Sequence, residues 1–249
     1  MPSPDHLTFW EHLDVLRGSL IRMLVAAVGM AVIAFCLKDQ LFALLLAPKD
    51  SQFITYRWLG NDESFDLHLV NTELTEQFMV HMRVALAIGV LAASPYIIFV
   101  LYQFISPALY EQERRYSVRL TVAAYVMFFV GIVVNYLLVF PLTVRFLGTY
   151  QVNSGVENML TITSYIDTLL LMSIVFGIIF EIPVLAWLLA KSGLIRSEWM
   201  TRYRRHALVA ILVLAAIITP TSDIVTLLVV SFPIWFLYEA SILIVKLTK

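Results

Sequence analysis

Long apolar segments alternate with shorter polar segments along the whole chain. A hydrocarbon layer ~30 Å thick is crossed by about 20 helical residues that are mostly apolar. Four segments reach that length, and we expect each to be a membrane-spanning helix: residues 18–37, 78–102, 120–140 and 166–190. The pattern therefore predicts an all-α, polytopic membrane protein whose polar segments lie at the two membrane surfaces.

The last two apolar segments are shorter than these four. Ala207–Thr219 has 13 residues before Pro220, which is about 20 Å at ~1.5 Å per residue. The sixth helix is predicted over residues 224–245, but its apolar part, Ile224–Tyr238, has only 15 residues before Glu239. We predict two short helices in a tight antiparallel hairpin, which either thin the bilayer or lie against partner proteins.

The polar segments outside the spans have patterns of their own. Within residues 1–17, apolar residues recur at helical spacing, which predicts a helix on the inner membrane surface. Residues 39–77 and 141–164 are predicted to be two outer loops. The first of these loops opens with an apolar run that Pro48 ends, and we expect it to form a cap at the membrane interface.

The composition supports a membrane protein and excludes a nucleic-acid-binding protein. Of the 249 residues, 60% are hydrophobic and 14% are charged, whereas an average soluble domain has about 25% charged residues. The net charge of −1 is not that of a basic nucleic-acid binder. Membrane lipids, and not nucleic acid, are the expected partners.

The basic residues predict the orientation of the spans. With the N-terminus in the cytoplasm, 12 of the 17 Lys and Arg residues fall in inner segments. This is the bias of the positive-inside rule, and the first outer loop is instead rich in Asp and Glu. We therefore predict six transmembrane helices with both termini on the cytoplasmic side.

No pattern typical of catalysis or metal binding is present in the sequence. The chain lacks zinc-protease, serine-hydrolase and phosphate-loop motifs, and its histidines are scattered. The single cysteine, Cys36, has no second cysteine with which to form a disulfide. We expect no catalytic residue, no metal site and no cofactor, so the protein is not predicted to be an enzyme.

One carboxylate, that of Glu181, falls inside the fourth span. A charge at the bilayer centre costs roughly 2.5–3.5 kcal/mol on insertion scales, so the group must face a cavity, a partner or a proton. Pro183 removes a backbone donor and crowds the carbonyl of Ile179, which predicts a kink beside Glu181. Two interpretations stay open: a functional intramembrane group, or a protonated side chain bonded to a neighbouring helix.

A second candidate site lies in the inner loop between the second and third spans. Ser106 and Pro107 suit the N-cap and first position of a helix that continues into the third span. Glu111 and Glu113 follow, and Phe104 precedes them. Carboxylates beside aromatic rings can bind guanidinium groups. On these residues alone, however, the simpler interpretation is a charged loop in which Glu113 pairs with a local arginine.

The outer turn between the fifth and sixth helices, Thr219 to Asp223, offers no chemistry. Asp223 comes directly before the sixth apolar segment and is of a residue type preferred at the N-cap. We therefore expect Asp223 to cap the sixth helix.

Several motifs, taken in order along nearly the whole chain, resemble the TatC family, the multispanning receptor component of the twin-arginine protein translocase. They are His12-Leu-x-x-Leu-Arg17, Ala47-Pro48, Ser94-Pro95, Phe104-Ile-x-Pro-Ala-Leu-Tyr-x-x-Glu-Arg-Arg115, Phe140-Pro141, Phe180-Glu-x-Pro183 and Thr219-Pro220. The fourth motif is the most specific of them. Structural roles are expected for the prolines in these motifs: Pro48, Pro95, Pro107, Pro141, Pro183 and Pro220.

The resemblance implies a receptor for folded proteins whose signal peptides carry an Arg-Arg pair. In that family the inner loop and the N-terminal region bind the two arginines, so Glu113 becomes the leading candidate, supported by Phe104. Arg17 and Glu111 are the further candidates in this region. Glu181 would meet the path of the signal peptide or the transmembrane helix of a partner subunit.

The resemblance also implies partners and a location. Single-span subunits of the TatA and TatB type would dock near the short fifth and sixth helices. The chain would self-associate in a multimeric receptor complex of the cell inner membrane, and the proton-motive force would drive transport.

The chain departs from the family at one position of the N-terminal motif. The family usually has Glu where this chain has Val15, so one carboxylate that would help to bind the arginine pair is absent. Asp14 is adjacent, but one residue rotates a side chain by about 100° around a helix. Asp14, Glu11 and Glu111 are the possible replacements, and we favour Asp14.

The hypothesis is therefore a non-enzymatic translocase component in which Glu113 and Asp14 capture the twin arginines. The alternative is an ion-coupled small-solute transporter with Glu181 as its proton relay. The sequence disfavours that alternative because it has no inverted repeat and only one carboxylate near the middle of a span.

Overall fold

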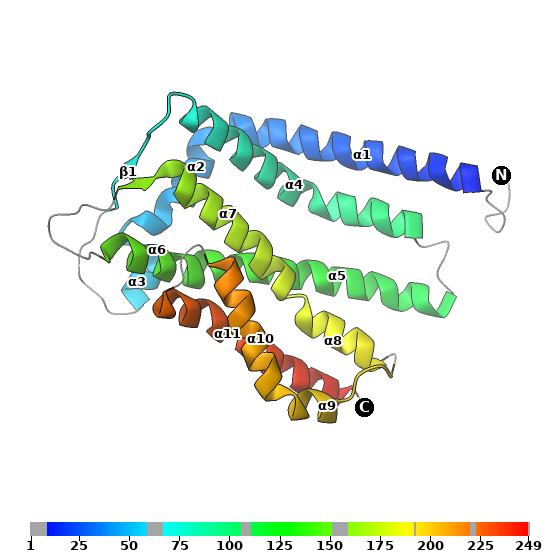
Figure 1. Cartoon of the computed structure of the whole chain (residues 1–249). Coiled ribbons are helices and arrows are strands. Elements are labelled where there is room, and N and C mark those ends of the chain that lie inside the picture. Colours follow the sequence, from blue (N-terminus) through cyan, green and yellow to red (C-terminus); the bar gives the residue numbers. More distant parts are fainter. Residues whose placement is uncertain are drawn as a thin grey trace. The chain divides into compact units, whose positions relative to one another are not determined.

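A computed structural model gives the architecture (Figure 1). It describes the backbone of residues 9–58, 67–105, 111–150, 159–191, 193–219 and 223–248. Side chains are described from residue 13 onward in these ranges, except over residues 101–105 and 111–120. In the described residues the fold is helical apart from two short parallel strands, β1 (Leu69–Val70) and β2 (Leu160–Thr161). The predicted all-α, polytopic fold class is confirmed.

The chain divides into two compact units. The first comprises Met1–Phe42 and Phe78–Tyr125, and the second comprises Ala43–Gln77 and Val126–Lys249. Each unit is described by itself below.

The first unit contains α1 (Phe9–Cys36), most of α4 (Glu76–Ile105) and the first half of α5 (Glu111–Val134). Helices α1 and α4 run antiparallel (Figure 1). They approach closely at Gly89, where an added Cβ would lie 2.5 Å from the Cα of Ala31. A glycine is required there because small residues let two membrane helices approach closely.

The Ser94-Pro95 motif has a local explanation inside α4. A proline cannot donate its backbone N–H, so the carbonyl four residues earlier, that of Leu91, loses its helical partner. The Ser94 hydroxyl donates to this carbonyl at 2.5 Å. The serine thus satisfies the acceptor that the proline leaves free, and α4 continues through Pro95.

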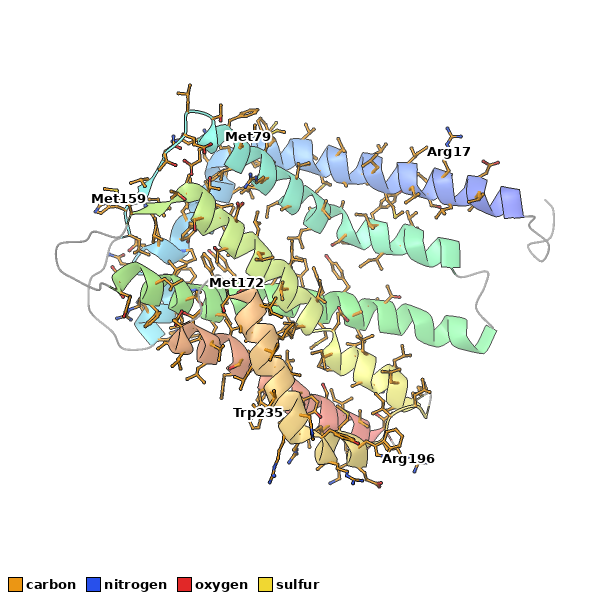
Figure 2. All side chains as sticks on the ribbon, in the orientation of Figure 1. Arg17, Met79, Met159, Met172, Arg196 and Trp235 are labelled. Atoms are coloured by element: carbon orange, nitrogen blue, oxygen red, sulfur yellow. The ribbon has the colours of Figure 1, made fainter. Side chains whose placement is uncertain are left out.

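The second unit contains the remaining elements. They are most of α2 (Lys38–Leu46), the 3-10 turn η2 (Ala47–Lys49), α3 (Ile54–Trp58), the second half of α5, the π-helical turn η4 (Asn135–Val139), α6 (Phe140–Thr149), α7 (Ile162–Ile179), α8 (Ile182–Lys191), α9 (Ser197–Arg202), α10 (Arg204–Ile218) and α11 (Ile224–Leu247). Helix α11 packs mainly against α8 and α10. Met172 of α7 is fully buried in the interior of this unit (Figure 2).

The third helical segment extends past the predicted boundary at residue 140. Helix α5 continues through η4 into α6, which ends at Thr149, so the prediction that Pro141 begins an outer loop is wrong. Pro141 leaves the Leu137 carbonyl without its helical donor, and the Thr55 hydroxyl donates to that carbonyl instead. A donor from a distant segment thus lets the helix continue.

Five helical segments in the described chain are long and apolar enough to cross a membrane. They are Leu13–Cys36, Glu76–Val100, Thr121–Thr149, Ile162–Lys191 and Ile224–Leu247. The predicted fifth span, α10, has 15 residues and is short as expected. The predicted range of the sixth helix, 224–245, agrees with α11 to within two residues. The expectation that this helix is short is wrong, because α11 has 24 residues and continues through Glu239. The Glu239 carboxylate forms an ion pair with Arg204, which compensates its charge.

The segments outside the predicted spans contain more helix than expected. No boundary separates residues 9–17 from the first span, because α1 is one continuous helix from Phe9 to Cys36. The predicted outer loop 39–77 includes α2, η2 and α3. The expected cap of the sixth helix is confirmed, since the Asp223 carboxylate accepts from the backbone N–H of Thr226 at 2.6 Å.

Candidate functional site

The candidate residues of the region predicted to be on the inner side belong to three helix ends in the first unit. Asp14 and Arg17 lie near the start of α1, Phe104 lies in the last turn of α4, and Glu111 and Glu113 lie in the first turn of α5. Figure 1 shows these three ends at the same end of the unit. Pro107 and Ser106 lie outside the described residues, as do the side chains of Phe104, Glu111 and Glu113.

The contacts between α1 and α4 align Asp14 with the end of α4. Phe35 stacks on His81 with ring centroids 4.0 Å apart, and Ala31 approaches Gly89. Both helices rise about 1.5 Å per residue. Continuing this antiparallel alignment along the two backbones brings Asp14 roughly level with Phe104.

The rotation of α1 decides which side its polar residues occupy. Ser19 and Met23 are buried and mark the packed side of the helix, whereas Asp14 and Arg17 are exposed. Asp14 precedes Ser19 by five residues, a rotation of about 140° away from the packed side. Figure 2 shows Arg17 projecting from α1 on the side away from α4. Both side chains are therefore available only to a molecule that lies outside the α1–α4 pair.

The start of α5 is a favourable place for carboxylates. Glu111 is the first residue of the helix and Glu113 the third. Unpaired backbone N–H groups and the helix dipole stabilise negative charge in the first turn.

The fourth span is interrupted at Glu181. Helix α7 ends at Ile179 and α8 begins at Ile182, so Phe180 and Glu181 form a turn between them, as Pro183 predicts. The Glu181 side chain is half-buried, and no described residue donates a hydrogen bond to its carboxylate or pairs with it. Glu181 thus offers an acceptor inside a membrane-spanning segment to a group from outside the described chain.

A second polar group in the spans, the side-chain amide of Asn135, is partly satisfied within the fold. Asn135 is fully buried in the π-helical turn, and its amide donates to the Ser173 hydroxyl of α7 at 3.0 Å. The Asn135 side-chain oxygen is buried without a partner in the described chain. This pair joins two membrane-spanning segments, which is a structural use of polarity.

A buried tyrosine joins two of the prolines expected to be structural. The Tyr56 side chain is 1% exposed, and its hydroxyl lies 2.9 Å from the Pro48 carbonyl and 2.8 Å from the Pro141 carbonyl. One O–H donor is therefore shared between two carbonyls. Burial raises the pKa of the Tyr56 hydroxyl above its usual range, and the Arg145 guanidinium beside the ring opposes this only in part.

Two more tyrosines connect α2 to the long helices of the second unit. The Tyr136 hydroxyl donates to the Leu44 carbonyl at 2.5 Å, and the Tyr165 hydroxyl donates to the Leu45 carbonyl at 3.1 Å. Leu44 and Leu45 lie in the last turn of α2, whose carbonyls have no helical donors. With Tyr56 these residues form the outer tyrosine network: Tyr56, Tyr136 and Tyr165.

The buried carboxylate of Glu76 accepts hydrogen bonds from backbone N–H groups and from a hydroxyl. It accepts from the backbone N–H groups of Thr72 at 2.7 Å and Glu73 at 3.2 Å, and from the Thr72 hydroxyl. It also accepts from the backbone N–H of Thr163, at the start of α7, at 3.2 Å. Glu76 therefore connects the segment before α4 to the beginning of α7.

Sequence reasoning missed the structural roles of Tyr56, Asn135 and Glu76. Asn135 carried a signal, since it is a polar residue within a predicted span. Glu76 also carried one, because it stands just before an apolar segment, where acidic residues stabilise a helix start. Nothing in the local sequence distinguishes Tyr56 from the other ten tyrosines, because its partners are far away along the chain.

The sequence was also compared with known proteins. Residues 11–233 match the sequence model of a family described as Sec-independent protein translocase protein (TatC). A relative of that name from Carboxydothermus hydrogenoformans is 33% identical over 98% of this chain and 94% of its own length. Another from Deinococcus radiodurans is 34% identical over 100% of this chain and 90% of its own length.

The fold is similar to a solved structure described as the twin arginine translocase receptor TatC. That crystal structure aligns with a TM-score of 0.73 and 31% sequence identity, and the alignment covers 96% of this chain and 99% of the solved chain. A second crystal structure, described as the same receptor in DDM, gives a TM-score of 0.72 at the same identity.

Proposed function

The chain belongs to the TatC family and is a receptor component of the twin-arginine protein translocase, and we propose that its inner helix ends bind the Arg-Arg pair of signal peptides. The small-solute transporter considered from the sequence has no support in these similarities. The proposal depends chiefly on one observation: the most specific sequence motif, Phe104 to Arg115, falls at the junction of α4 and α5.

Glu113 is the principal carboxylate in this proposal. It lies in the first turn of α5, where the helix dipole favours an ionised carboxylate. A carboxylate accepts two parallel N–H bonds from one guanidinium, a geometry that lysine cannot reproduce. This difference gives a physical reason for a preference for paired arginines over paired lysines.

The other candidates have secondary roles. Phe104 is the first residue of the same motif and would support the bound peptide through stacking on a guanidinium. Glu111 would add negative charge in the same turn as Glu113. Asp14 is the proposed second carboxylate, and Arg17 completes the α1 part of the region. Because Asp14 and Arg17 are exposed on the far side of α1, they would contact the peptide only where it lies outside α1.

Partner binding is proposed for the fourth span and the C-terminal helices. The half-buried Glu181 carboxylate has no donor in the described chain, so we propose that it meets the signal peptide or a single-span TatA- or TatB-type subunit. Those subunits would dock beside α10 and α11, whose outer faces are apolar. Ile217, for example, is 75% exposed. Self-association, an inner-membrane location with cytoplasmic termini, and transport driven by the proton-motive force complete the proposal.

A binding measurement with matched variants tests the role of Glu113. A fluorescent signal peptide with Arg-Arg, and the same peptide with Lys-Lys, would be titrated against purified full-length protein. Glu113→Gln should weaken binding of the Arg-Arg peptide by about tenfold or more, since a hydrogen bond to a charged group contributes about 1.5–3 kcal/mol. Glu73→Gln, which removes one exposed carboxylate elsewhere, should leave affinity unchanged. Equal affinities for Glu113→Gln and the parental protein would refute the proposal.

A further inference from the structure

The corner between α8 and α10 in the second unit gathers exposed aromatic and basic side chains. Trp199 of α9 is 56% exposed and Tyr203 is 54% exposed. Around them the described residues carry six basic side chains and two carboxylates. The basic ones are Lys191, Arg196, Arg202, Arg204, Arg205 and Lys246, and the carboxylates are Glu198 and Glu239. We name this set, with the two aromatic residues, the α9 corner.

The charges of the α9 corner are only partly compensated. Arg204 is paired with Glu239 at 2.7 Å. Arg202 and Arg205 are exposed, and within the described chain neither has an ion pair or a hydrogen bond from its guanidinium. Arg196, which Figure 2 shows at the same end of the unit, is exposed as well. A surplus of exposed guanidinium groups therefore remains at this corner.

Two contacts from α11 hold the α9 corner in place. The Tyr238 hydroxyl donates to the Met200 carbonyl of α9 at 2.8 Å. The next residue of α11, Glu239, forms the ion pair with Arg204 at the start of α10. Because both anchors come from one membrane-spanning helix, the backbone that carries Trp199, Arg202 and Arg205 is fixed relative to the end of that helix.

We propose that the α9 corner binds the headgroups of anionic phospholipids. Arginine forms paired hydrogen bonds to phosphate oxygens, and basic residues at a membrane surface attract anionic lipids. Exposed Trp and Tyr rings lie at the headgroup level of membrane proteins, because one end of each ring is apolar and the other is polar. The corner joins the ends of α8 and α11, both parts of membrane-spanning segments, which places it where headgroups are.

This occupant fits the corner better than an acidic protein segment does. Leu194 is 64% exposed beside the charged residues, and together with Trp199 it provides apolar surface that acyl chains would cover. The proposal depends only on the protein lying in a membrane. It does not depend on the binding of signal peptides or on which face of the membrane the corner occupies.

Quenching of tryptophan fluorescence by brominated lipids tests the proposal. The protein would be reconstituted in phosphatidylcholine vesicles that contain brominated phosphatidylglycerol or brominated phosphatidylcholine. The contribution of Trp199 is the difference between the parental protein and Trp199→Phe. The measurement gives an association constant for each lipid at this site. For each unpaired arginine, we expect the constant for phosphatidylglycerol to exceed that for phosphatidylcholine by a further factor of about five.

Two double variants separate the α9 corner from a general effect of charge. Arg202→Gln with Arg205→Gln should lower the ratio of the two association constants about 25-fold, which is fivefold for each arginine removed. Lys38→Gln with Arg57→Gln removes two exposed positive charges elsewhere and should leave the ratio unchanged. A ratio near one in the parental protein, or a ratio that the first pair does not lower, would overturn the proposal. Binding of a soluble acidic peptide at the corner, without lipid preference, would overturn it too.

Discussion

Two regions of the second unit differ in whether their polar side chains have hydrogen-bond partners in the described chain. In the outer tyrosine network, Tyr56 lies within hydrogen-bond distance of two backbone carbonyls, and Tyr136 and Tyr165 each reach one more. At the break between α7 and α8, the Glu181 carboxylate has no donor among the described residues. The first region is complete within one chain, whereas the second leaves an acceptor unused.

The difference distinguishes polar groups that stabilise the fold from a polar group that can bind another molecule. A tyrosine whose buried hydroxyl donates to backbone carbonyls stabilises the fold, because the hydroxyl would otherwise be buried without a hydrogen-bond partner. An unpaired carboxylate in a span contributes nothing to the stability of the isolated chain and costs free energy. Such a group is expected to be used in the assembled machine.

The largest predicted effect is on Tyr56. Tyr56→Ala removes a 1% exposed ring and the donor shared by Pro48 and Pro141, so it should lower the free energy of unfolding by about 3–5 kcal/mol. Denaturant or detergent unfolding of the purified protein would measure this. Trp58→Ala, on the same short helix but 77% exposed, should cost less than about 0.5 kcal/mol. Equal losses of unfolding free energy for the two variants would contradict the structural role of Tyr56.

A smaller effect should appear at alkaline pH. Because burial raises the pKa of Tyr56, the folded protein retains the proton after the unfolded chain has lost it, above a pH of about 10. The contribution of Tyr56 to stability is therefore complete below that pH and declines above it. Between pH 9 and pH 11 the parental protein should lose about 1 kcal/mol more than Tyr56→Phe does. Parallel stability curves for the two proteins would contradict the predicted role of burial.

The Asn135–Ser173 pair should show a coupling of about 0.6 kcal/mol, the average of double-mutant cycles in membrane proteins. The cycle consists of Asn135→Ala, Ser173→Ala and the double variant, with unfolding measured for each. Additive single effects would show that the 3.0 Å hydrogen bond contributes nothing.

The smallest effect on stability is predicted for Glu181. Glu181→Gln should change the free energy of unfolding by less than about 0.5 kcal/mol, because no described contact is lost. Export of a twin-arginine substrate by cells that carry the variant should nevertheless fall. A large loss of stability with normal export would show that Glu181, like Tyr56, has a structural role.

The sequence predicted the helices well where apolar length alone decides. It failed at Pro141 and at Glu239, and for the same physical reason. Pro141 was expected to end a helix and Glu239 to end the apolar part of another, but a partner distant in sequence compensates each one. Thr55 satisfies the carbonyl that Pro141 frees, and Arg204 neutralises Glu239. Neither partner can be found from spacing along the chain.

The candidate site shows the same division. Residue type and position in a span made Glu181 a candidate, whereas Glu113 and Phe104 became candidates through the resemblance to a family. Periodicity could not reveal that Asp14 lies on the side of α1 away from its packed face, because that side is defined by contacts with α4, such as the approach of Ala31 to Gly89. Pro107 and Pro220 lie outside the described residues, so their structural roles stay predictions.

Crosslinking of a signal peptide tests the binding of twin arginines most directly. With Cys36→Ser as background, one cysteine would be placed at position 112 (Gln112→Cys) or at position 15 (Val15→Cys), and the parental protein with its exposed Cys36 serves as the control. A peptide with a cysteine beside its Arg-Arg pair should form disulfides at both engineered positions and not at Cys36. The Lys-Lys peptide should form none. Equal adducts with both peptides, or adducts at Cys36 alone, would contradict the account.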